Sequence, residues 1–270
     1  MLKATNFYPK NLLKTREDIF FNAKTKHYPS GLDKVSVSNK RVYRDKAYES
    51  RDYTKRNRPE TYNTNGESRA NNANAVRAHI FDIALCNKFT HFITLTFDPK
   101  KIDRYDDEEI KAKLKIWLKN AVARKELKYL LIPERHKDGA IHCHALVSGN
   151  LDFVDSGIVN DYGKPIYNIS DWKYGFSTAF EITDENGENA FIKYVTKYIT
   201  KESKKIFGNY YLAGGKGLKR DVPYSLSNMD YNSVDAEEHI VPLGDYDLKF
   251  KNYFEESRLI NLCQKLQTTV

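Results

Sequence analysis

A carboxylate and several imidazoles lie in a short stretch that is typical of a β-hairpin. Lys137-Asp138-Gly139 forms a turn signal, with glycine free to take a positive φ in a three-residue loop. That loop sets Glu134 opposite His142. Because strand side chains alternate between faces, Glu134, His136, His142 and His144 share one face and Cys143 points to the other. Three or four such side chains suit a divalent cation with positions open for water and substrate oxygen.

About fifty residues further on, residues 191–201 have the periodicity of an amphipathic helix. Phe191, Ile192, Val195 and Ile199 form the apolar stripe, and the adjoining stripe holds Tyr194, Lys197, Tyr198 and Lys201. The two tyrosines lie one helical turn apart and are flanked by lysines. A tyrosine pair beside cations, on a helix that can pack against a metal-bearing sheet, suits nucleophilic attack on a phosphodiester.

The charge of the chain favours a polyanionic partner. Its 270 residues carry a formal net charge of +8. Residues 1–90 hold 18 Lys/Arg against 9 Asp/Glu, so the positive surplus belongs to this third of the chain. The three cysteines lack the paired spacing of a disulfide framework or a cysteine zinc site, which fits a reducing cytoplasm. With no long apolar run, we expect no membrane association.

Composition divides the chain into three expected parts. Residues 1–74 form a basic, tyrosine-rich arm that ends in a polar linker over 61–75. The arm is either a nucleic-acid contact, with cations on phosphates and tyrosines on bases, or a solvated and partly disordered tail. Residues 75–202 form the main domain. Residues 203–270 add a basic, glycine-rich loop and a final helix over 253–267.

The elements expected within 75–202 indicate an α+β fold. They are a helix over 75–87, a strand over 91–98, a helix over 106–125, strands over 128–133 and 140–148, a loop to about 170, a bent strand over 172–182 and the tyrosine helix over 188–201. This order predicts a central antiparallel β-sheet with helices on one face, of ferredoxin-like kind.

Three segments, in this order, resemble the rolling-circle replication initiators of the HUH endonuclease superfamily, in the two-tyrosine class of phages and plasmids. Phe92-Ile-Thr-Leu-Thr-Phe97 is similar to the first motif, His142-Cys-His144 to the His-hydrophobic-His motif, and Tyr194-Val-Thr-Lys-Tyr198 to Tyr-x-x-Lys-Tyr. The resemblance covers residues 75–202. Two departures are the small Cys143 in place of a bulky aliphatic residue and the absence of a following helicase domain.

The resemblance implies a metal-dependent DNA-nicking endonuclease and strand transferase with the RRM-like fold of that superfamily. Mn²⁺ or Mg²⁺ would be held by His142, His144 and a third ligand, with Glu134 favoured by its place across the hairpin and His136 as the alternative. Tyr194 or Tyr198 would attack phosphorus, giving a 5′-phosphotyrosyl link and a free 3′-OH. Lys197 would lower the pKa of the nucleophile or hold the phosphate. The second tyrosine would end the round of replication.

The implied substrate is single-stranded or extruded origin DNA, because a tyrosine on a helix reaches a phosphate poorly within intact duplex. Six cations are the expected DNA contacts: Lys201, Lys204, Lys205, Lys216, Lys219 and Arg220. Tyr210 and Tyr211 offer stacking surfaces. A host or separate helicase and polymerase would act with the protein in the cytoplasm. The alternatives are a relaxase or transposase with the same chemistry, or a non-catalytic DNA-binding protein.

Overall fold

The computed structural model describes residues 20–45, 66–160, 163–182, 205–232, 240–242 and 247–254. Contacts group the chain into two compact units, one formed by 61–222 and the other by 1–60 together with 223–270. The grouping joins the two ends of the chain, because strands from both pair in one sheet. It therefore differs from a division into three consecutive parts.

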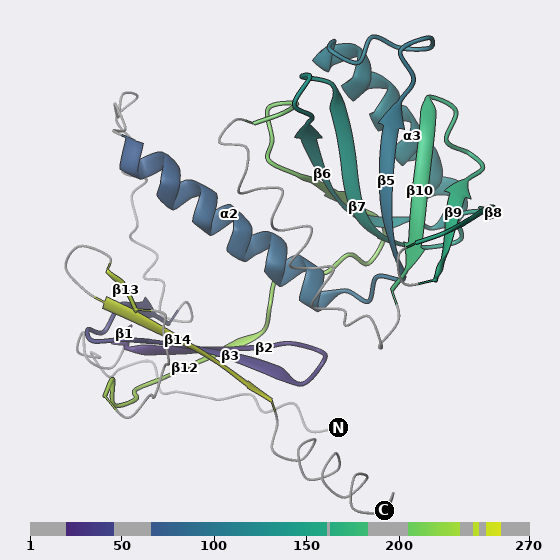
Figure 1. Cartoon of the computed structure of the whole chain (residues 1–270). Helices are drawn as coiled ribbons and strands as arrows, with labels where there is room; N and C mark the ends of the chain where they lie inside the picture. Colours follow the sequence, from purple (N-terminus) through teal and green to yellow (C-terminus); the bar gives the residue numbers. More distant parts are fainter. Residues whose placement is uncertain are drawn as a thin grey trace, which may run out of the picture. The chain divides into compact units, whose positions relative to one another are not determined.

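The unit formed by 61–222 is built on a seven-stranded antiparallel sheet with the order β11-β6-β7-β5-β10-β9-β8 (Figure 1). Its strands are β5 (His91–Phe97), β6 (Lys128–Arg135), β7 (Ile141–Ser148), β8 (Phe153–Val159), β9 (Pro165–Ile169), β10 (Gly175–Glu181) and β11 (Leu212–Gly214). The two helices in the described part of the chain are α2 (Gly66–Cys86) and α3 (Asp107–Lys125). The α+β class with a central antiparallel sheet is confirmed.

Helix α3 covers one face of this sheet and starts and stops as its sequence dictates. The side chain of Asp106 accepts hydrogen bonds from the backbone N–H groups of Glu108 and Glu109, both at 3.0 Å. Glu126, in the left-handed region at φ 52°, ends the helix. Its buried side chains are Ile110, Leu114, Trp117, Leu118 and Ala121. They share one core with Ile93, Leu95, Cys143, Ala145 and Val147 of the sheet. The histidines therefore lie on the face that α3 does not cover.

Helix α2 begins at Gly66, so the linker expected over 61–75 is wrong for residues 66–75. The asparagines in this stretch suggested a loop. Their helix propensity is lower than that of alanine by only about 0.7 kcal/mol per residue, and a helix already nucleated by the apolar turns further along extends at small cost. Those later turns bury Ile80, Ile83 and Ala84.

Two further expectations in this unit are wrong. The stretch from 149 to 170 is mostly the β8–β9 hairpin instead of a loop. Val154, Ile158 and Val159 are exposed at the sheet edge, so the strand lacks the alternation that marks a half-buried one. The strand expected from residue 172 starts at Gly175. The backbone bends there because Trp172 turns into the core, where its indole N–H donates to the Thr96 carbonyl at 3.2 Å.

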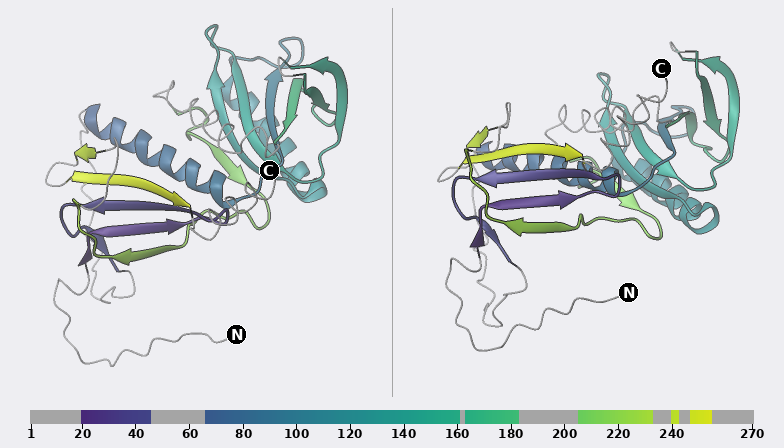
Figure 2. Two further views of the ribbon diagram at one scale, coloured as in Figure 1. Left: turned by 60° about the horizontal axis from the view of Figure 1, so that its bottom comes forward. Right: turned by 90° about the horizontal axis from the view of Figure 1, so that it is seen from below.

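The second unit is a five-stranded antiparallel sheet with the order β12-β2-β3-β14-β13, accompanied by the pair β1–β4. Its strands are β1 (Phe20–Phe21), β2 (Ala23–His27), β3 (Leu32–Ser38), β4 (Tyr43–Arg44), β12 (Tyr224–Ser227), β13 (Ile240–Pro242) and β14 (Asp247–Phe254). Figure 2 shows the alternating directions of β12, β2, β3 and β14. Ala23, Val35 and Val37 form its small core.

This second sheet corrects the expectation of a helix beginning at residue 253, because Tyr253 and Phe254 end strand β14. The rest of that expected helix lies outside the described residues. The basic segment 20–45 is likewise organised in strands, held in part by Asn22, whose amide donates to the carbonyls of Ser38 and Met229 at 3.1 and 2.7 Å. Within the described chain, no helix is long and apolar enough to cross a membrane.

Candidate metal and nucleic-acid site

The hairpin of β6 and β7 has the register that the sequence predicts. Glu134 pairs with His142 directly across the ladder. In the turn, Gly139 takes φ 90°, and the backbone N–H of His136 donates to the Ala140 carbonyl at 2.8 Å. Glu134, His142 and His144 therefore project from the face opposite α3.

Two threonines of the neighbouring strand β5 hold the histidine rings. Thr94 pairs with His144 and Thr96 with His142. Their hydroxyls lie within hydrogen-bond distance of the Nδ1 atoms, Thr94 Oγ1 at 3.1 Å from His144 and Thr96 Oγ1 at 3.2 Å from His142. A hydroxyl on Nδ1 fixes the ring orientation and directs Nε2 away from β5, as the outer partners of metal-ligating histidines do.

The roles of Thr94 and Thr96 were missed by the sequence analysis, although a signal for them was present. The strand His91–Phe97 alternates so that both threonines share a face, and Thr-rich composition is part of the first motif. Neither observation says which residue of β7 lies opposite which residue of β5. That register is set by long-range pairing, so the threonine–histidine contacts needed the structure.

Glu134 and His144 bring two donor atoms together. Glu134 Oε2 lies 3.1 Å from His144 Nε2, and the two side chains are only 13% and 11% exposed. Ligands about 2.1 Å from an octahedral ion and at right angles lie roughly 3 Å from each other. The separation of this pair thus fits two neighbouring positions around one cation. Phe92 stacks on the same imidazole, with ring centroids 5.9 Å apart.

His142 lies one ladder position away, in contact with the exposed His136. The two ring centroids are 4.4 Å apart, with planes inclined by 32°. Burial lowers the pKa of His142, and the positive charges of His136 and Arg104 act in the same direction, while Asp138 opposes them. The neutral imidazole, which is the form that binds metal ions, is therefore favoured at His142.

Within the residues described, no set of three His, Cys, Asp or Glu side chains is gathered closely enough to hold a metal ion. Glu134 and His144 supply one adjacent pair of donors, and His142 completes a trio only if its ring moves toward them. Cys143 is fully buried on the α3 face, where burial raises the pKa of its thiol, so this residue takes no part.

The predicted nucleophiles Tyr194 and Tyr198 lie outside the described residues, and so does Lys197. The same holds for two of the expected DNA contacts, Lys201 and Lys204. The described chain leaves the sheet at the end of β10, where Ile182 N–H donates to the Thr90 carbonyl at 2.8 Å. It returns at Lys205, ahead of β11, on the other side of the sheet.

The other four expected DNA contacts follow this return. Lys205 lies over the ring of Tyr210, with its Nζ 5.5 Å from the centroid. Arg220 donates from Nη2 to the Ala213 carbonyl at 2.6 Å. Lys219 is joined to the end of α2, because its backbone N–H donates to Asn87 Oδ1 at 2.9 Å. Lys216 is exposed in the glycine-rich loop. None of the four contacts the histidine pair.

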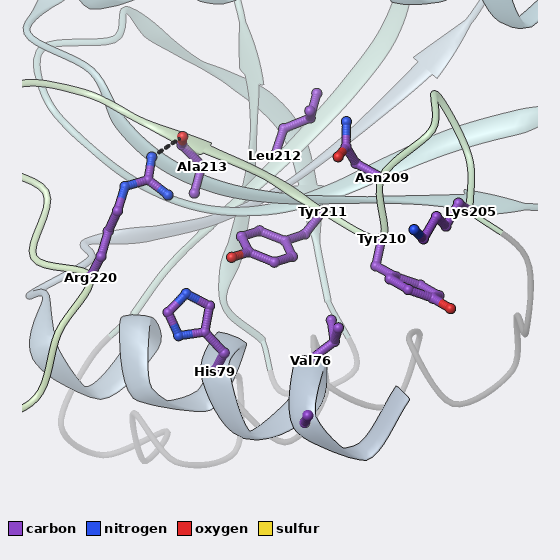
Figure 3. A pocket seen from close by; sticks show the side chains of 10 residues that line it. Val76, His79, Lys205, Asn209, Tyr210, Tyr211, Leu212, Ala213 and Arg220 are labelled. Carbon is purple, nitrogen blue, oxygen red and sulfur yellow. Dashed lines mark hydrogen bonds between the residues drawn. The ribbon is translucent and has the colours of Figure 1, made fainter. Parts of the chain in front are cut away.

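Lys205 and Arg220 line a groove of about 770 Å³ between α2 and the segment 205–220, which we call the α2–β11 groove. His79 of α2 and Tyr211 face each other across it, with ring centroids 6.1 Å apart (Figure 3). The sequence analysis singled out Tyr210 and Tyr211 but gave no reason for α2 to lie opposite them.

Residues 90–203 match the model of one protein family, the replication-associated proteins of the ORF2 type. The match supports a replication-initiator family. It begins just before β5 and ends in the segment that carries the tyrosine motif, so it includes Thr94, Thr96, Glu134 and both histidines. No curated protein and no solved structure matches the chain significantly.

Proposed function

We propose that the protein initiates rolling-circle replication by nicking one strand of origin DNA and forming a covalent 5′-phosphotyrosyl link. The single observation that carries this proposal is the arrangement of Glu134, His142 and His144 on the open face of a sheet within the stretch matched by the replication-associated family. A role in replication follows from the family match. The nicking chemistry is the part that we infer.

Topology supports bringing the tyrosines to this site. The described chain leaves β10 at the end of the sheet where Glu181 pairs with His91 and His91 with Val147. His144 and His142 lie three and five residues back along β7 from Val147, roughly 10 and 16 Å at about 3.3 Å per residue. A helix started at residue 188 and running back along the sheet rises roughly 9 Å by Tyr194 and roughly 15 Å by Tyr198. Each tyrosine would then stand level with one histidine.

The covered face of the sheet supports the same course. The segment 183–204 joins β10 to the region before β11, which pairs with β6, and must therefore pass β5, β7 and β6. The apolar side of α3 occupies one face. The remaining face is the one that carries the histidines, and an amphipathic helix laid across it would present Tyr194 and Tyr198 to them.

Mn²⁺ or Mg²⁺ is the proposed cofactor, with His142, His144 and Glu134 as its ligands. The 3.1 Å separation of Glu134 Oε2 from His144 Nε2 and the threonine contacts at both Nδ1 atoms support this ligand set. A mixed nitrogen and oxygen set favours Mn²⁺ over Mg²⁺, which prefers oxygen. When bound, the ion would offset charge on the non-bridging phosphate oxygens. His136 is the competing ligand.

The proposed chemistry is a transesterification. The phenol oxygen of Tyr194 or Tyr198 forms a bond to phosphorus, the bond from phosphorus to the 3′ oxygen breaks, and the proton lost by the phenol is balanced by one taken up at the new 3′-OH. Because a phenol with an ordinary pKa near 10 is mostly neutral, Lys197 would assist by stabilising the phenolate or the phosphate. The second tyrosine would repeat the transfer after one lap.

Single-stranded or extruded origin DNA is the proposed substrate, with a separate helicase and polymerase as partners. A relaxase or transposase would share the chemistry and differ in the site and in dependence on replication. A nick mapped to the origin of a replicating element separates these cases. A non-catalytic DNA-binding protein would give no cleavage at all.

The test incubates end-labelled single-stranded origin DNA with the full chain and Mn²⁺, and resolves the products under denaturing conditions. We expect cleavage and a denaturant-resistant adduct, both abolished by EDTA. Combining Tyr194→Phe with Tyr198→Phe should abolish the adduct, because no phenol remains to attack, whereas either single change should leave some cleavage.

Tyr167→Phe on β9 is the matched control, since it removes one phenol far from the histidines and should leave the adduct in place. An adduct that persists in the variant without both tyrosines would show that another residue is the nucleophile. Full activity in EDTA would remove the proposed metal.

A further inference from the structure

The α2–β11 groove is a second concave site in the unit formed by 61–222, separate from the histidine pair. Its volume of about 770 Å³ falls in the range of pockets that hold small organic ligands. Three aromatic rings line it, those of His79, Tyr210 and Tyr211, together with two cations, Lys205 and Arg220 (Figure 3). No carboxylate is among the described residues that line it.

The groove is fixed on both sides. The amide of Asn87, just after α2, donates to the Lys219 carbonyl at 2.7 Å and accepts from the Lys219 N–H at 2.9 Å, so α2 and the loop are held by a two-way bond. On the other side, Gly215 packs so closely that an added Cβ would lie 2.3 Å from the Leu127 carbonyl oxygen. The wall that carries Arg220 is therefore anchored to two elements.

The cations are positioned at the ends of a row of rings. Arg220 is oriented by its bond to the Ala213 carbonyl, and the same guanidinium has further N–H donors that suit a phosphate. Lys205 lies over Tyr210 at the other end. Tyr211 is half-buried, and burial raises the pKa of its phenol although Arg220 opposes this. The phenol stays neutral, which suits stacking and hydrogen bonding.

We propose that the α2–β11 groove holds an unpaired nucleotide of single-stranded DNA, with the base among His79, Tyr210 and Tyr211 and the flanking phosphates on Arg220 and Lys205. Aromatic faces that take the bases and cations that follow the backbone are the two parts of single-strand binding sites. An exposed duplex base edge would not reach rings that face each other across a groove.

This site rests on the proposed function for its substrate and extends it by naming where the strand is held away from the scissile linkage. Leu212 of β11 pairs with Leu131, three residues before Glu134 on β6. That offset is roughly 10 Å along the strand. DNA with its scissile phosphate at the histidines would therefore reach the groove within a few nucleotides.

The test measures binding of a fluorescent oligothymidylate of about 15 nucleotides to the full chain, without metal so that cleavage does not intervene. We expect Arg220→Ala and Tyr211→Leu each to weaken binding about tenfold, because each removes one phosphate contact or one stacking surface. Arg220→Lys and Tyr211→Phe, which keep the charge or the ring, should lose less than their partners.

Arg124→Ala is the matched control. Arg124 is an exposed arginine in the last turn of α3, on the covered side of the sheet, so its removal changes net charge equally without touching the groove. A loss in Arg124→Ala equal to that in Arg220→Ala would show general charge attraction only and overturn the proposal. Equal binding of a duplex of the same length, with the same sensitivity to Tyr211→Leu, would overturn it too.

A second measurement covers the case in which Tyr211→Leu fails to fold. Irradiating the wild-type chain with an oligonucleotide that carries 5-iodouracil should crosslink to Tyr210, Tyr211 or His79. A crosslink found elsewhere contradicts the site. The two proposals fail separately: an adduct with binding unchanged in the groove variants ends this one alone, and groove-dependent binding without any adduct ends only the nicking chemistry.

Discussion

The histidine pair and the α2–β11 groove belong to the same sheet but are built in different ways. Glu134, His142 and His144 lie on adjacent strands, and each ring is held by a threonine directly across the ladder. The groove instead joins a helix to a loop through the contact of Asn87 with Lys219, 132 residues apart. Strand pairing fixes donor atoms within tenths of an ångström, which chemistry needs. A helix-and-loop groove can adjust to different bases.

The sharpest way to break this comparison is to remove both imidazoles. His142→Ala with His144→Ala should lower metal-dependent nicking by about 1000-fold or more, because electrostatic stabilisation by even one group is commonly worth about 100- to 1000-fold. Affinity for oligothymidylate should remain within about threefold, because the groove makes its contacts elsewhere. Single-turnover cleavage and fluorescence anisotropy measure the two quantities.

The groove variants should show the converse pattern, with affinity lost and the rate at saturating DNA largely kept. If removing the histidines weakens DNA binding as much as cleavage, the two regions do not divide the work between them. The comparison would then be wrong.

The threonines sharpen the comparison on the chemical side. Thr94→Val with Thr96→Val keeps the shape of both side chains and removes the hydroxyls that contact Nδ1 of the histidines. We expect Mn²⁺ affinity to fall about 10- to 100-fold, the usual effect of losing outer partners of metal ligands. Isothermal titration with Mn²⁺ measures this, and Thr178→Val on β10, a threonine paired with Thr94, is the control. Unchanged affinity would show that the hydroxyls do not orient the rings.

The sequence was sufficient for the hairpin and insufficient for the groove, for the same physical reason. A turn signal and the two-residue period of strands place Glu134 opposite His142 using information that is local in the chain. The pairing of Thr94 with His144 and the approach of His79 to Tyr211 depend on segments that meet only after folding. Local periodicity carries no information about such contacts.

The errors in the fold have equally specific causes. Residues 66–75 were expected to be a linker because asparagine is common in loops, yet they extend α2. Strands β8 and β9 were missed because their apolar side chains are exposed at an edge. In the second unit, β2 and β3 bury only a few small side chains against segments from the far end of the chain, so their sequence lacks a strong apolar alternation.

Gly175 tests whether close strand spacing near the histidines matters. A Cβ on this residue would lie 2.1 Å from the Thr96 carbonyl oxygen, so β10 and β5 must separate locally to accept it. We expect Gly175→Ala to lower the free energy of unfolding by about 1–3 kcal/mol, as overpacking does, and to weaken Mn²⁺ binding through Thr96. Urea denaturation measures the first effect.

Gly157→Ala is the control for Gly175→Ala. It places an alanine at φ 72° in the exposed β8–β9 hairpin, where no atom lies within 4 Å of the added Cβ. It should cost some stability through backbone strain and leave Mn²⁺ binding unchanged. Equal loss of Mn²⁺ affinity in both variants would mean that general destabilisation, and not the position of Thr96, is responsible.

The smallest expected effect concerns His91, at the far end of β5 from His142. Its ring stacks on Phe153 at 4.0 Å, and burial lowers its pKa although Glu181 opposes the shift. Because an unfolded histidine titrates near 6.5 and the folded one below that, the unfolded state binds more protons as pH falls through this range. The contribution of His91 to stability is thus present above about pH 6.5 and lost as the pH falls to its folded pKa. His91→Gln should therefore lose less stability between about pH 7.5 and pH 5 than the wild type, and Glu181→Gln should lose more, since it removes the charge that raises this pKa. Urea denaturation at each pH gives the slopes, and parallel curves for His91→Gln and the wild type would show that the ring is not held neutral by its burial.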